Sequence, residues 1–366
     1  MMTKRFKQIS LASLAVLGVF LWAGGAWPQT LAQVIEGAKK EGAVAARIKS
    51  GVTPKSIERL ESEIKKKFDV ELRIKFAPSS NMPQDLSEIM MENKVGVSPS
   101  YDILNMMSSH VTAGIKAGVL EKVNWEPLLT KGTHRKALIG IPPHDERLYG
   151  YGVTYYTGRM GVMYNPKKVS AHELPKTLSA LADPKWEGKV AIFNYPNAWT
   201  RLAFVGGKDK VLSDLRAILK NGAIQGRYVD EYSRYLLGEV WLVYLSTAYL
   251  KMAWDKGVEA GWHGIDPVDV QHFSLALTKG ARHPNAARLL VSYLASPEGA
   301  KFMLEEGGAG NYLYPGNFEY DLHQREVKQG LRHVSAEESH IVEFEISEEY
   351  TKWEKEIILI LQTGGK

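Results

Sequence analysis

The sequence predicts an α/β fold. Short runs with the alternating hydrophobicity of strands are followed by helix-capping signals, and this pairing recurs on both sides of a Tyr-rich segment at 148–164. Strands that alternate with helices in this way are typical of sheets whose strands run parallel. The sequence contains no internal repeat and no low-complexity stretch that would favour another architecture.

The first helix and strand are marked by local signals. Thr30 and Gln33 have the spacing of a capping box, and Gly42 is the kind of residue that commonly follows a helix end. A short apolar strand is expected at 43–48. Thr53 followed by a proline then predicts the start of a second helix. The buried face of that helix is expected to carry Ile57, Leu60, Ile64 and Phe68.

Two more strand–helix pairs complete the first part of the chain. Apolar residues alternate over 70–76, which predicts a strand, and the polar turn at 78–81 leads into a helix. A third strand is expected at 101–107. Ser108 then opens a helix that ends near Gly118.

The segment at 148–164 is rich in Tyr, Gly and Thr and is expected to be extended. It would serve either as a long strand or as a crossover between two lobes. The remaining expected elements are a strand at 190–193, a turn at 194–197, a helix at 199–205, a strand at 239–245, a helix from Ser246 to about Lys256, an extended segment at 266–277, and helices from Pro284 onward, the last capped by Ser347 and ended by Gly364.

The N-terminus has the pattern of a secretory signal peptide. Lys4, Arg5 and Lys7 precede an uncharged, mostly apolar run at 9–22, and small residues follow at 23–26. This order predicts export and cleavage after residue 26. The alternative is a membrane anchor, but the run is short for a span of about 20 residues and ends in small residues rather than charges. The mature chain is therefore expected to be soluble and periplasmic.

Composition excludes several classes of function. The chain of 366 residues has 46 basic and 41 acidic residues; three basic residues lie in the leader, so the mature chain is nearly neutral at +2. No run supplies the basic face that nucleic acid requires, so no nucleic-acid partner is expected. The absence of Cys excludes disulfides, thiolate metal sites and Cys nucleophiles. The mature length exceeds the usual size of one core, so two domains are expected.

Polar loops at the expected strand ends share one chemistry. In open α/β sheets ligands bind beyond the carboxyl ends of strands, where helix N-termini offer free backbone N–H groups to an anion. Each loop alone is explained by ordinary helix capping, but five together predict a shared cleft for a small ligand. The loops are Lys49–Gly51, Ser79–Asn81, Ser108 with Ser109, Asn194 through Thr200, and Ser246 with Thr247.

Catalytic and metal signatures are missing from the sequence. It contains no nucleophile elbow, no phosphate-binding Walker loop and no paired-His zinc motif. His110 and His272 lie nearest the expected cleft, and Asp266 with Asp269 would serve as an acid–base pair in an exported enzyme. Each of these has a simpler structural explanation, so no enzyme activity and no cofactor are expected.

Four motifs in order resemble the extracellular solute-binding proteins of ABC importers. They are Glu36–Gly42 before the first strand, Gly161–Pro166, Leu181–Val190, and the pair formed by 279–287 and 296–300. The resemblance covers nearly all of the mature chain. It is greatest to the branch that contains ferric iron, polyamine, thiamine and phosphonate binders.

The resemblance implies the type II periplasmic-binding-protein fold. Each of its two lobes would hold a parallel-rich sheet with flanking helices, and two crossing strands, at 148–157 and 268–274, would join the lobes. Closure about this hinge would present the bound solute to a membrane permease. The implied division is a signal peptide at 1–26, lobe 1 at 27–150, lobe 2 at 151–268, and a return to lobe 1 with C-terminal helices at 269–366. A monomer is expected.

The favoured ligand is a small anionic or carboxylated solute, or an oxyanion. Lys49 and Arg159 are the candidate charge partners, and Tyr195 or Trp199 would form a stacking wall. The expected ligand-binding residues are Lys49, Ser50, Ser79, Ser80, Asn81, Ser108, Ser109, Tyr155, Arg159, Asn194, Tyr195, Asn197, Trp199, Thr200, Ser246, Thr247 and Tyr249.

The alternative ligand is ferric iron, which prefers oxygen donors. Iron binders of this family typically place two adjacent Tyr at the start of the helix that here begins at Ser246, where this chain offers only Tyr249. Tyr155 and Tyr156 are adjacent but lie in the crossing segment. They would join Tyr249 as ligands if the iron alternative held.

Overall fold

The structure is a computed structural model that describes residues 29–365. The predicted signal peptide at 1–26 lies outside the described residues. Within 29–365, no helix is long and apolar enough to cross a membrane.

A ten-stranded sheet runs through both halves of the molecule, with its main path in the order β2-β1-β3-β9-β4-β7-β5-β6. β10 pairs with β9 and β8 pairs with β4 outside this path. The strands are β1 (Ala43–Lys49), β2 (Arg73–Ser79), β3 (Ile103–Met106), β4 (Val153–Tyr164), β5 (Val190–Phe193), β6 (Ile224–Gly226), β7 (Leu242–Ser246), β8 (Gly261–His263), β9 (Val268–Leu277) and β10 (His333–Ser335).

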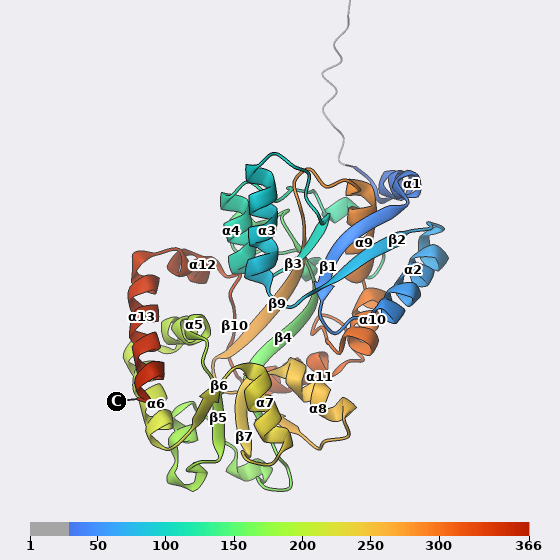
Figure 1. Ribbon diagram of the computed structural model, residues 1–366. Helices are drawn as coiled ribbons and strands as arrows, with labels where there is room; N and C mark the ends of the chain where they lie inside the picture. The colour runs from blue at the N-terminus through green and yellow to red at the C-terminus, as the bar shows by residue number, and fades with distance from the viewer. Residues whose placement is uncertain (1–28, 366) are drawn as a thin grey trace, which may run out of the picture.

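The pairing divides the sheet into two lobes. β1 runs parallel to β2 and β3 in lobe 1, and β5 runs parallel to β6 and β7 in lobe 2. β4 and β9 pair antiparallel to each other and pass from one lobe to the other (Figure 1). The predicted α/β architecture, with two parallel-rich lobes joined by two crossing strands, is therefore confirmed.

Helices cover both faces of the sheet in each lobe (Figure 1). They are α1 (Leu31–Glu41), α2 (Pro54–Phe68), α3 (Met82–Lys94), α4 (Ser108–Lys116), α5 (Pro196–Gly206), α6 (Lys208–Lys220), α7 (Tyr228–Leu236), α8 (Thr247–Asp255), α9 (Pro284–Leu294), α10 (Pro297–Gly307), α11 (Phe318–Lys328), α12 (Ser339–Glu345) and α13 (Glu348–Thr363).

Separate hydrophobic clusters hold the two lobes. In lobe 1, side chains of α1, α2, α9 and α10 cover one face of the sheet and those of α3 and α4 cover the other. In lobe 2, α7 and α8 cover one face, while α5, α6 and α13 cover the other. The last helix therefore packs on lobe 2, where Ile357, Ile360 and Leu361 are buried.

Several elements differ from the sequence prediction, and β2 and α5 show why. β2 begins at Arg73, although Val70 and Leu72 continue the apolar alternation toward the N-terminus, because its pairing with β1 starts only where Ala43 faces Arg73. α5 begins at Pro196, inside the predicted turn, because proline fits the first helical position. Asn197 is thus part of a helix rather than of a loop.

Candidate functional site

The facing edges of the two lobes form the cleft. Because β1, β2 and β3 are parallel, their carboxyl ends lie at one edge of lobe 1, and those of β5, β6 and β7 lie likewise at one edge of lobe 2. β4 and β9 cross between these edges. The helices that follow the strands begin at the cleft, so those whose first turns are not capped by a side chain can offer backbone N–H groups to a ligand.

A small cavity of about 60 Å³ lies where the lobes meet at the crossing strands. It brings together Lys49 from the end of β1 and Ser246 from the end of β7, two of the predicted residues. The amino group of Lys49 donates to the carbonyl of Gly307 at 2.7 Å, and burial lowers its pKa. The Lys49 amino group is thus already hydrogen-bonded within lobe 1. The cavity is lined by Lys49, Tyr156, Thr157, Gly158, Ser246, Ala248, Phe273, Ala309, Gly310, Phe318 and Glu319.

Three tyrosines gather at the cleft edge of lobe 2. Tyr195 precedes α5, Tyr228 opens α7 and Tyr249 lies in the first turn of α8. The ring centroids of Tyr195 and Tyr228 are 4.7 Å apart, and those of Tyr228 and Tyr249 are 6.0 Å apart. We call Tyr195, Tyr228 and Tyr249 the tyrosine cluster. Each tyrosine follows the carboxyl end of a different strand, β5, β6 or β7. Because these strands are parallel neighbours, the sheet brings the three tyrosines together.

The hydroxyls of the cluster are suited to donating hydrogen bonds. Among residues 29–365, the hydroxyls of Tyr195 and Tyr249 contact no hydrogen-bond partner, and that of Tyr228 reaches only the sulfur of Met160, at 3.8 Å. Burial raises the pKa of Tyr249 to about 12 and raises the pKa of Tyr228 as well. Both phenols are therefore protonated at neutral pH.

Two of the helices that carry the tyrosine cluster, α5 and α7, begin without a side-chain cap. The residue before α5, Tyr195, and the residue before α7, Arg227, make no capping hydrogen bond. By contrast, Ser246 caps α8 through the backbone N–H of Ala248. The first-turn N–H groups of α5 and α7 are thus not satisfied by capping side chains, which is the arrangement that favours an anion.

Tyr228 was not predicted as a binding residue from the sequence, because neither β6 nor α7 was predicted. β6 has only three residues, and α7 lacks the Ser, Thr, Asp or Asn that usually marks a helix start. A usable signal was present, since Tyr228, Tyr232 and Tyr235 recur at helical spacing.

The predicted loops of lobe 1 have mixed roles. Asn81 caps α3, and the hydroxyl of Ser79 donates to the Asp85 carboxylate at 2.6 Å, so both are used within the fold. Ser108 is buried, and its hydroxyl contacts no partner among residues 29–365. The exposed residues of these loops are Ser50, Ser80, Asn81 and Ser109; of these, only the Asn81 side chain is already hydrogen-bonded within the described residues.

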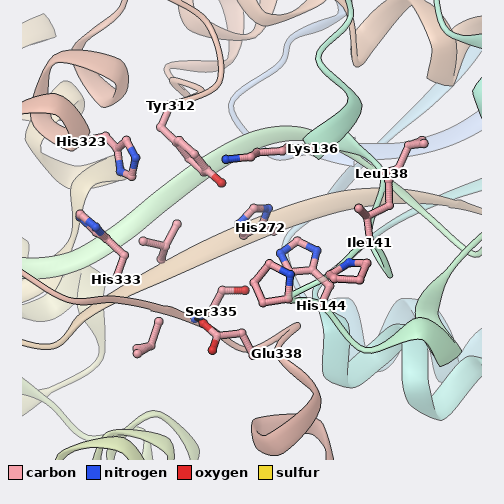
Figure 2. A pocket seen from close by; sticks show the side chains of 14 residues that line it. Lys136, Leu138, Ile141, His144, His272, Tyr312, His323, His333, Ser335 and Glu338 are labelled. Carbon is pink, nitrogen blue, oxygen red and sulfur yellow. Dashed lines mark hydrogen bonds between the residues drawn. The ribbon is translucent and has the colours of Figure 1, made fainter. Parts of the chain in front are cut away.

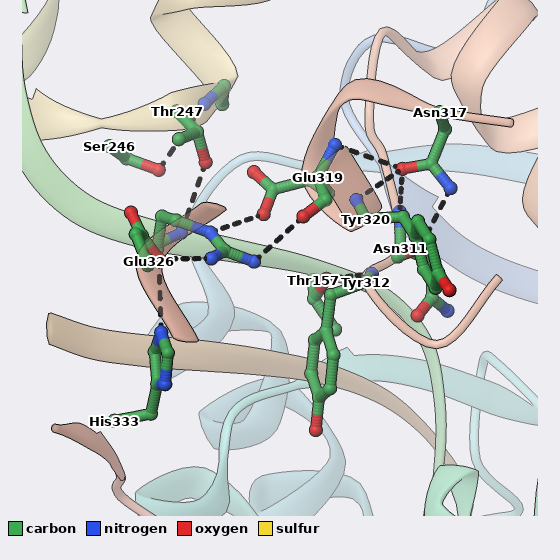
Figure 3. Close-up of polar contacts among 12 residues, drawn as sticks. Thr157, Ser246, Thr247, Asn311, Tyr312, Asn317, Glu319, Tyr320, Glu326 and His333 are labelled. Atoms are coloured by element: carbon green, nitrogen blue, oxygen red, sulfur yellow. Dashed lines mark hydrogen bonds and ion pairs between the residues drawn. The ribbon is translucent and has the colours of Figure 1, made fainter. Parts of the chain in front are cut away.

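Arg159 requires a correction, because its charge is already neutralised. It is fully buried, and its guanidinium donates to the carboxylates of Glu319 and Glu326 (Figure 3). Its backbone N–H donates to the hydroxyl of Thr247, which is also buried. Arg159 and Thr247 therefore join β4 to α8 and α11, and neither offers a free group to a solute in this conformation.

Trp199 and Thr200 are also placed inside the fold. Trp199 is fully buried, and its indole N–H donates to the carbonyl of Phe193 at 2.9 Å. The Thr200 hydroxyl donates to the carbonyl of Pro196. Of the predicted stacking walls only Tyr195 is accessible. Asn194 and Asn197 are exposed, and Asn194 lines a groove against α13 rather than the cavity at the crossing strands.

The structure does not bring Tyr155 or Tyr156 to Tyr249. Tyr155 is fully buried, and its hydroxyl accepts the backbone N–H of Lys49 at 3.1 Å. Tyr156 stacks on Phe273 with centroids 4.3 Å apart. Both rings belong to the core of lobe 1. The neighbours of Tyr249 are instead Tyr228 and Tyr232.

The residues of the enzyme alternative are engaged elsewhere. Asp266 pairs with Arg332 at 2.9 Å, and Asp269 pairs with Arg201 at 3.1 Å. His272 points away from Phe273, which lines the cleft, because successive strand residues face opposite sides. Among residues 29–365, no group of three His, Asp or Glu side chains is placed to hold a metal ion.

A family model described as bacterial extracellular solute-binding protein matches residues 60–327, well over half of the chain. The chain belongs to this family. The resemblance predicted from the sequence is thereby confirmed, and the family implies a small-molecule ligand and an ABC permease as partner. A comparison with curated proteins finds no match.

Solved structures share the two-lobed fold. Iron-bound HitA from Pseudomonas aeruginosa is 20% identical with a TM-score of 0.61, covering 86% of this chain and 99% of its own. The polyamine-transporter protein PotD from Streptococcus pneumoniae is 12% identical with a TM-score of 0.65, covering 88% and 99%. AfuA from Actinobacillus pleuropneumoniae, with bound fructose-6-phosphate, is 16% identical with a TM-score of 0.60, covering 87% and 98%. At these identities the likeness concerns the fold alone.

Proposed function

We propose that this protein is the periplasmic solute-binding component of an ABC importer and that its solute carries an oxyanionic group, such as a carboxylate or phosphate. The solute would bind in the interlobe cleft and be delivered, unchanged, to the membrane permease. The leader at 1–26 would direct export and be removed. The mature protein would act as a monomer without a cofactor.

The tyrosine cluster carries this proposal. Its three phenol hydroxyls would donate hydrogen bonds to a solute, and the uncapped first turns of α5 and α7 add backbone N–H donors at the positive ends of two helix dipoles. Arg227, at the start of α7, is already paired with Asp230. A site made of neutral donors binds an oxyanion without a fully buried ion pair, whose desolvation is costly.

Lobe 1 would complete the site on closure. Lys49 and Ser246 already line one cavity from the two lobes, and the hydroxyl residues Ser50, Ser80 and Ser109 are exposed in the loops of lobe 1. Rotation about β4 and β9 would bring these donors over a solute held by the tyrosine cluster. AfuA, whose fold is similar, was solved with a sugar phosphate, which agrees with a cleft of this kind binding an anion.

Titration calorimetry on the mature protein tests the proposal. The panel would contain phosphate, sulfate, citrate and sugar phosphates, each compared with an uncharged analogue. At least one anion should bind saturably, and its Kd should rise about tenfold in Tyr228→Phe and in Tyr249→Phe. Tyr151→Phe, a change in lobe 1 outside the tyrosine cluster, is the matched control and should leave the Kd unchanged. Preference for an uncharged analogue would contradict the proposal.

A second candidate is ferric iron, favoured by the same three phenol oxygens. Iron would have to displace the phenolic protons, so binding would release protons and would depend on pH. It would also produce a visible tyrosinate-to-iron absorption band. A band that Tyr249→Phe weakens would support this candidate; binding without any band would count against it.

A further inference from the structure

A second cavity lies at the hinge, on the other side of β9 from the cleft. It measures about 180 Å³ and is lined by segments from four parts of the chain (Figure 2). Val270 and His272 of β9 face it, whereas Phe273 faces the cleft, because successive strand residues point to opposite sides. Its lining consists of Lys136, Leu138, Ile141, Pro142, Pro143, His144, Val270, His272, Tyr312, His323, His333, Val334, Ser335 and Glu338.

Aromatic rings form a continuous chain along this cavity. His144 meets His272 edge to face at 5.1 Å, and His272 meets Tyr312 at 5.6 Å. Tyr312 in turn lies 4.6 Å from His323, whose ring is 4.5 Å from that of His333. Rings in this arrangement offer both faces and edges to a further ring. Six aliphatic side chains complete the lining: Leu138, Ile141, Pro142, Pro143, Val270 and Val334.

Several polar groups in this cavity have no partner within the fold. The Nδ1 atoms of His144 and His323 are buried without a hydrogen bond. Burial lowers the pKa of His144, of His272 and of His323 to about 4, so these rings are neutral at pH 7. Among residues 29–365, the Tyr312 hydroxyl has no hydrogen-bond partner.

The two charged side chains at the rim of the cavity, Lys136 and Glu338, differ in whether they have partners within the fold. Among residues 29–365, the amino group of Lys136 makes no ion pair or hydrogen bond, and it lies on the same side of the cavity as the Tyr312 hydroxyl in Figure 2. The Glu338 carboxylate, by contrast, accepts the backbone N–H of Ser335 at 2.9 Å and lies 3.7 Å from His340. Lys136 thus offers a cation without a partner among the described residues, and an anionic group bound beside it would also accept from the Tyr312 hydroxyl.

The volume limits the ligand to a single ring. An apolar cavity of about 150 Å³ holds one benzene molecule, so 180 Å³ holds one six-membered ring with one or two small substituents. We propose that this cavity is a second small-molecule site and that it takes a monocyclic aromatic carboxylate, with the ring against the imidazoles and the aliphatic side chains of the lining and the carboxylate at Lys136 and Tyr312. The proposal is independent of the cleft and of the solute that the cleft binds.

The test uses the full mature protein at pH 7.5 with 4-hydroxybenzoate, benzoate and nicotinate as probes, and benzyl alcohol and benzylamine as uncharged and cationic comparisons. At least one carboxylate should bind with a Kd of roughly 0.1 to 1 mM, as expected for so small a ligand. Lys136→Met should raise that Kd about tenfold. Lys131→Met, an exposed lysine outside the cavity, should leave it unchanged.

Two further variants locate the site. Ile141→Phe should abolish binding by filling the cavity, and a thermal unfolding curve would establish that the variant is folded. Tyr228→Phe, in the cleft, should leave binding intact. The proposal is overturned if no carboxylate binds saturably, if Lys136→Met has no effect, if the comparisons bind equally well, or if Tyr228→Phe abolishes binding and so places the probe in the cleft.

Discussion

Arg159 and Glu319 form an ion pair inside the hinge region, with 2.8 Å between the guanidinium Nε and the carboxylate. Both side chains are fully buried, and Glu326 accepts from the same guanidinium (Figure 3). Arg159 lies in β4, a crossing strand, whereas both carboxylates lie on α11. The pair therefore ties the hinge to a helix that packs against lobe 2.

Removing the arginine should be strongly destabilising. Arg159→Met leaves two buried carboxylates without their main counter-charge, which typically costs about 3–5 kcal/mol. Urea unfolding monitored by circular dichroism would measure the loss. Arg234→Met is the matched control, because its pair with Glu239 is exposed and such pairs contribute little. Equal effects in the two variants would mean that burial of the Arg159 pair does not matter.

Glu231 should make stability fall as pH rises. It is 1% exposed, both carboxylate oxygens lack partners, and burial raises its pKa from 4.5 to about 7. Between pH 4.5 and about 7, the Glu231 carboxyl is therefore protonated in the folded state and ionised in the unfolded state. The free energy of unfolding is thus greatest below pH 4.5, declines up to about pH 7 and is level above that pH. Gly226 allows this placement, since a Cβ there would lie 2.3 Å from a Glu231 oxygen.

Glu231→Gln isolates this contribution. The variant should match the wild type at pH 4.5 and exceed it at pH 8 by up to about 3 kcal/mol, the equivalent of the pKa shift. Unfolding free energies of both proteins at a series of pH values would provide the comparison. A constant difference across that range would contradict the prediction.

Trp199→Phe should change stability and leave solute affinity unaltered. The substitution removes the hydrogen bond to the Phe193 carbonyl and leaves space in a stacked cluster, at a cost of about 1–3 kcal/mol. Because the ring faces the core of lobe 2, the Kd of the solute should stay within about twofold. A large change in Kd at unchanged stability would restore Trp199 as a stacking wall.

Tyr228 and Tyr249 should contribute jointly to binding. Their rings are neighbours, so the effects of Tyr228→Phe and Tyr249→Phe on the Kd should not add. A double-mutant cycle by calorimetry would give the coupling, with Tyr228 and Tyr151 as the uncoupled reference pair. Strict additivity would contradict the prediction and would mean that the two hydroxyls contribute to binding independently.

Local sequence signals predicted much of the fold. β5 occupies the predicted range, and β1 extends the predicted strand by one residue, because apolar runs flanked by turn residues define both. The caps predicted at Thr30, Thr53 and Ser347 are present as well. These features depend on neighbouring residues, which the sequence displays directly.

The candidate site was harder to predict, because its contacts are distant in sequence. From the sequence alone, Arg159 was predicted to be a cation free to bind a solute in the cleft. Its partners Glu319 and Glu326 are 160 and 167 residues away, so only the structure places them beside it. The histidines of the second cavity come from four separate segments and have no informative spacing. Tyr228 was not predicted because β6, the strand that precedes it, is too short to leave a periodic signal.

The most direct measurement is native mass spectrometry, with an absorbance scan, of protein purified from the periplasm without added ligand. We expect a bound organic or oxyanionic mass, no visible band, and loss of that mass in Tyr228→Phe. A bound mass equal to iron alone, with a visible band that disappears in Tyr249→Phe, would contradict the claim that the tyrosine cluster binds an anionic solute.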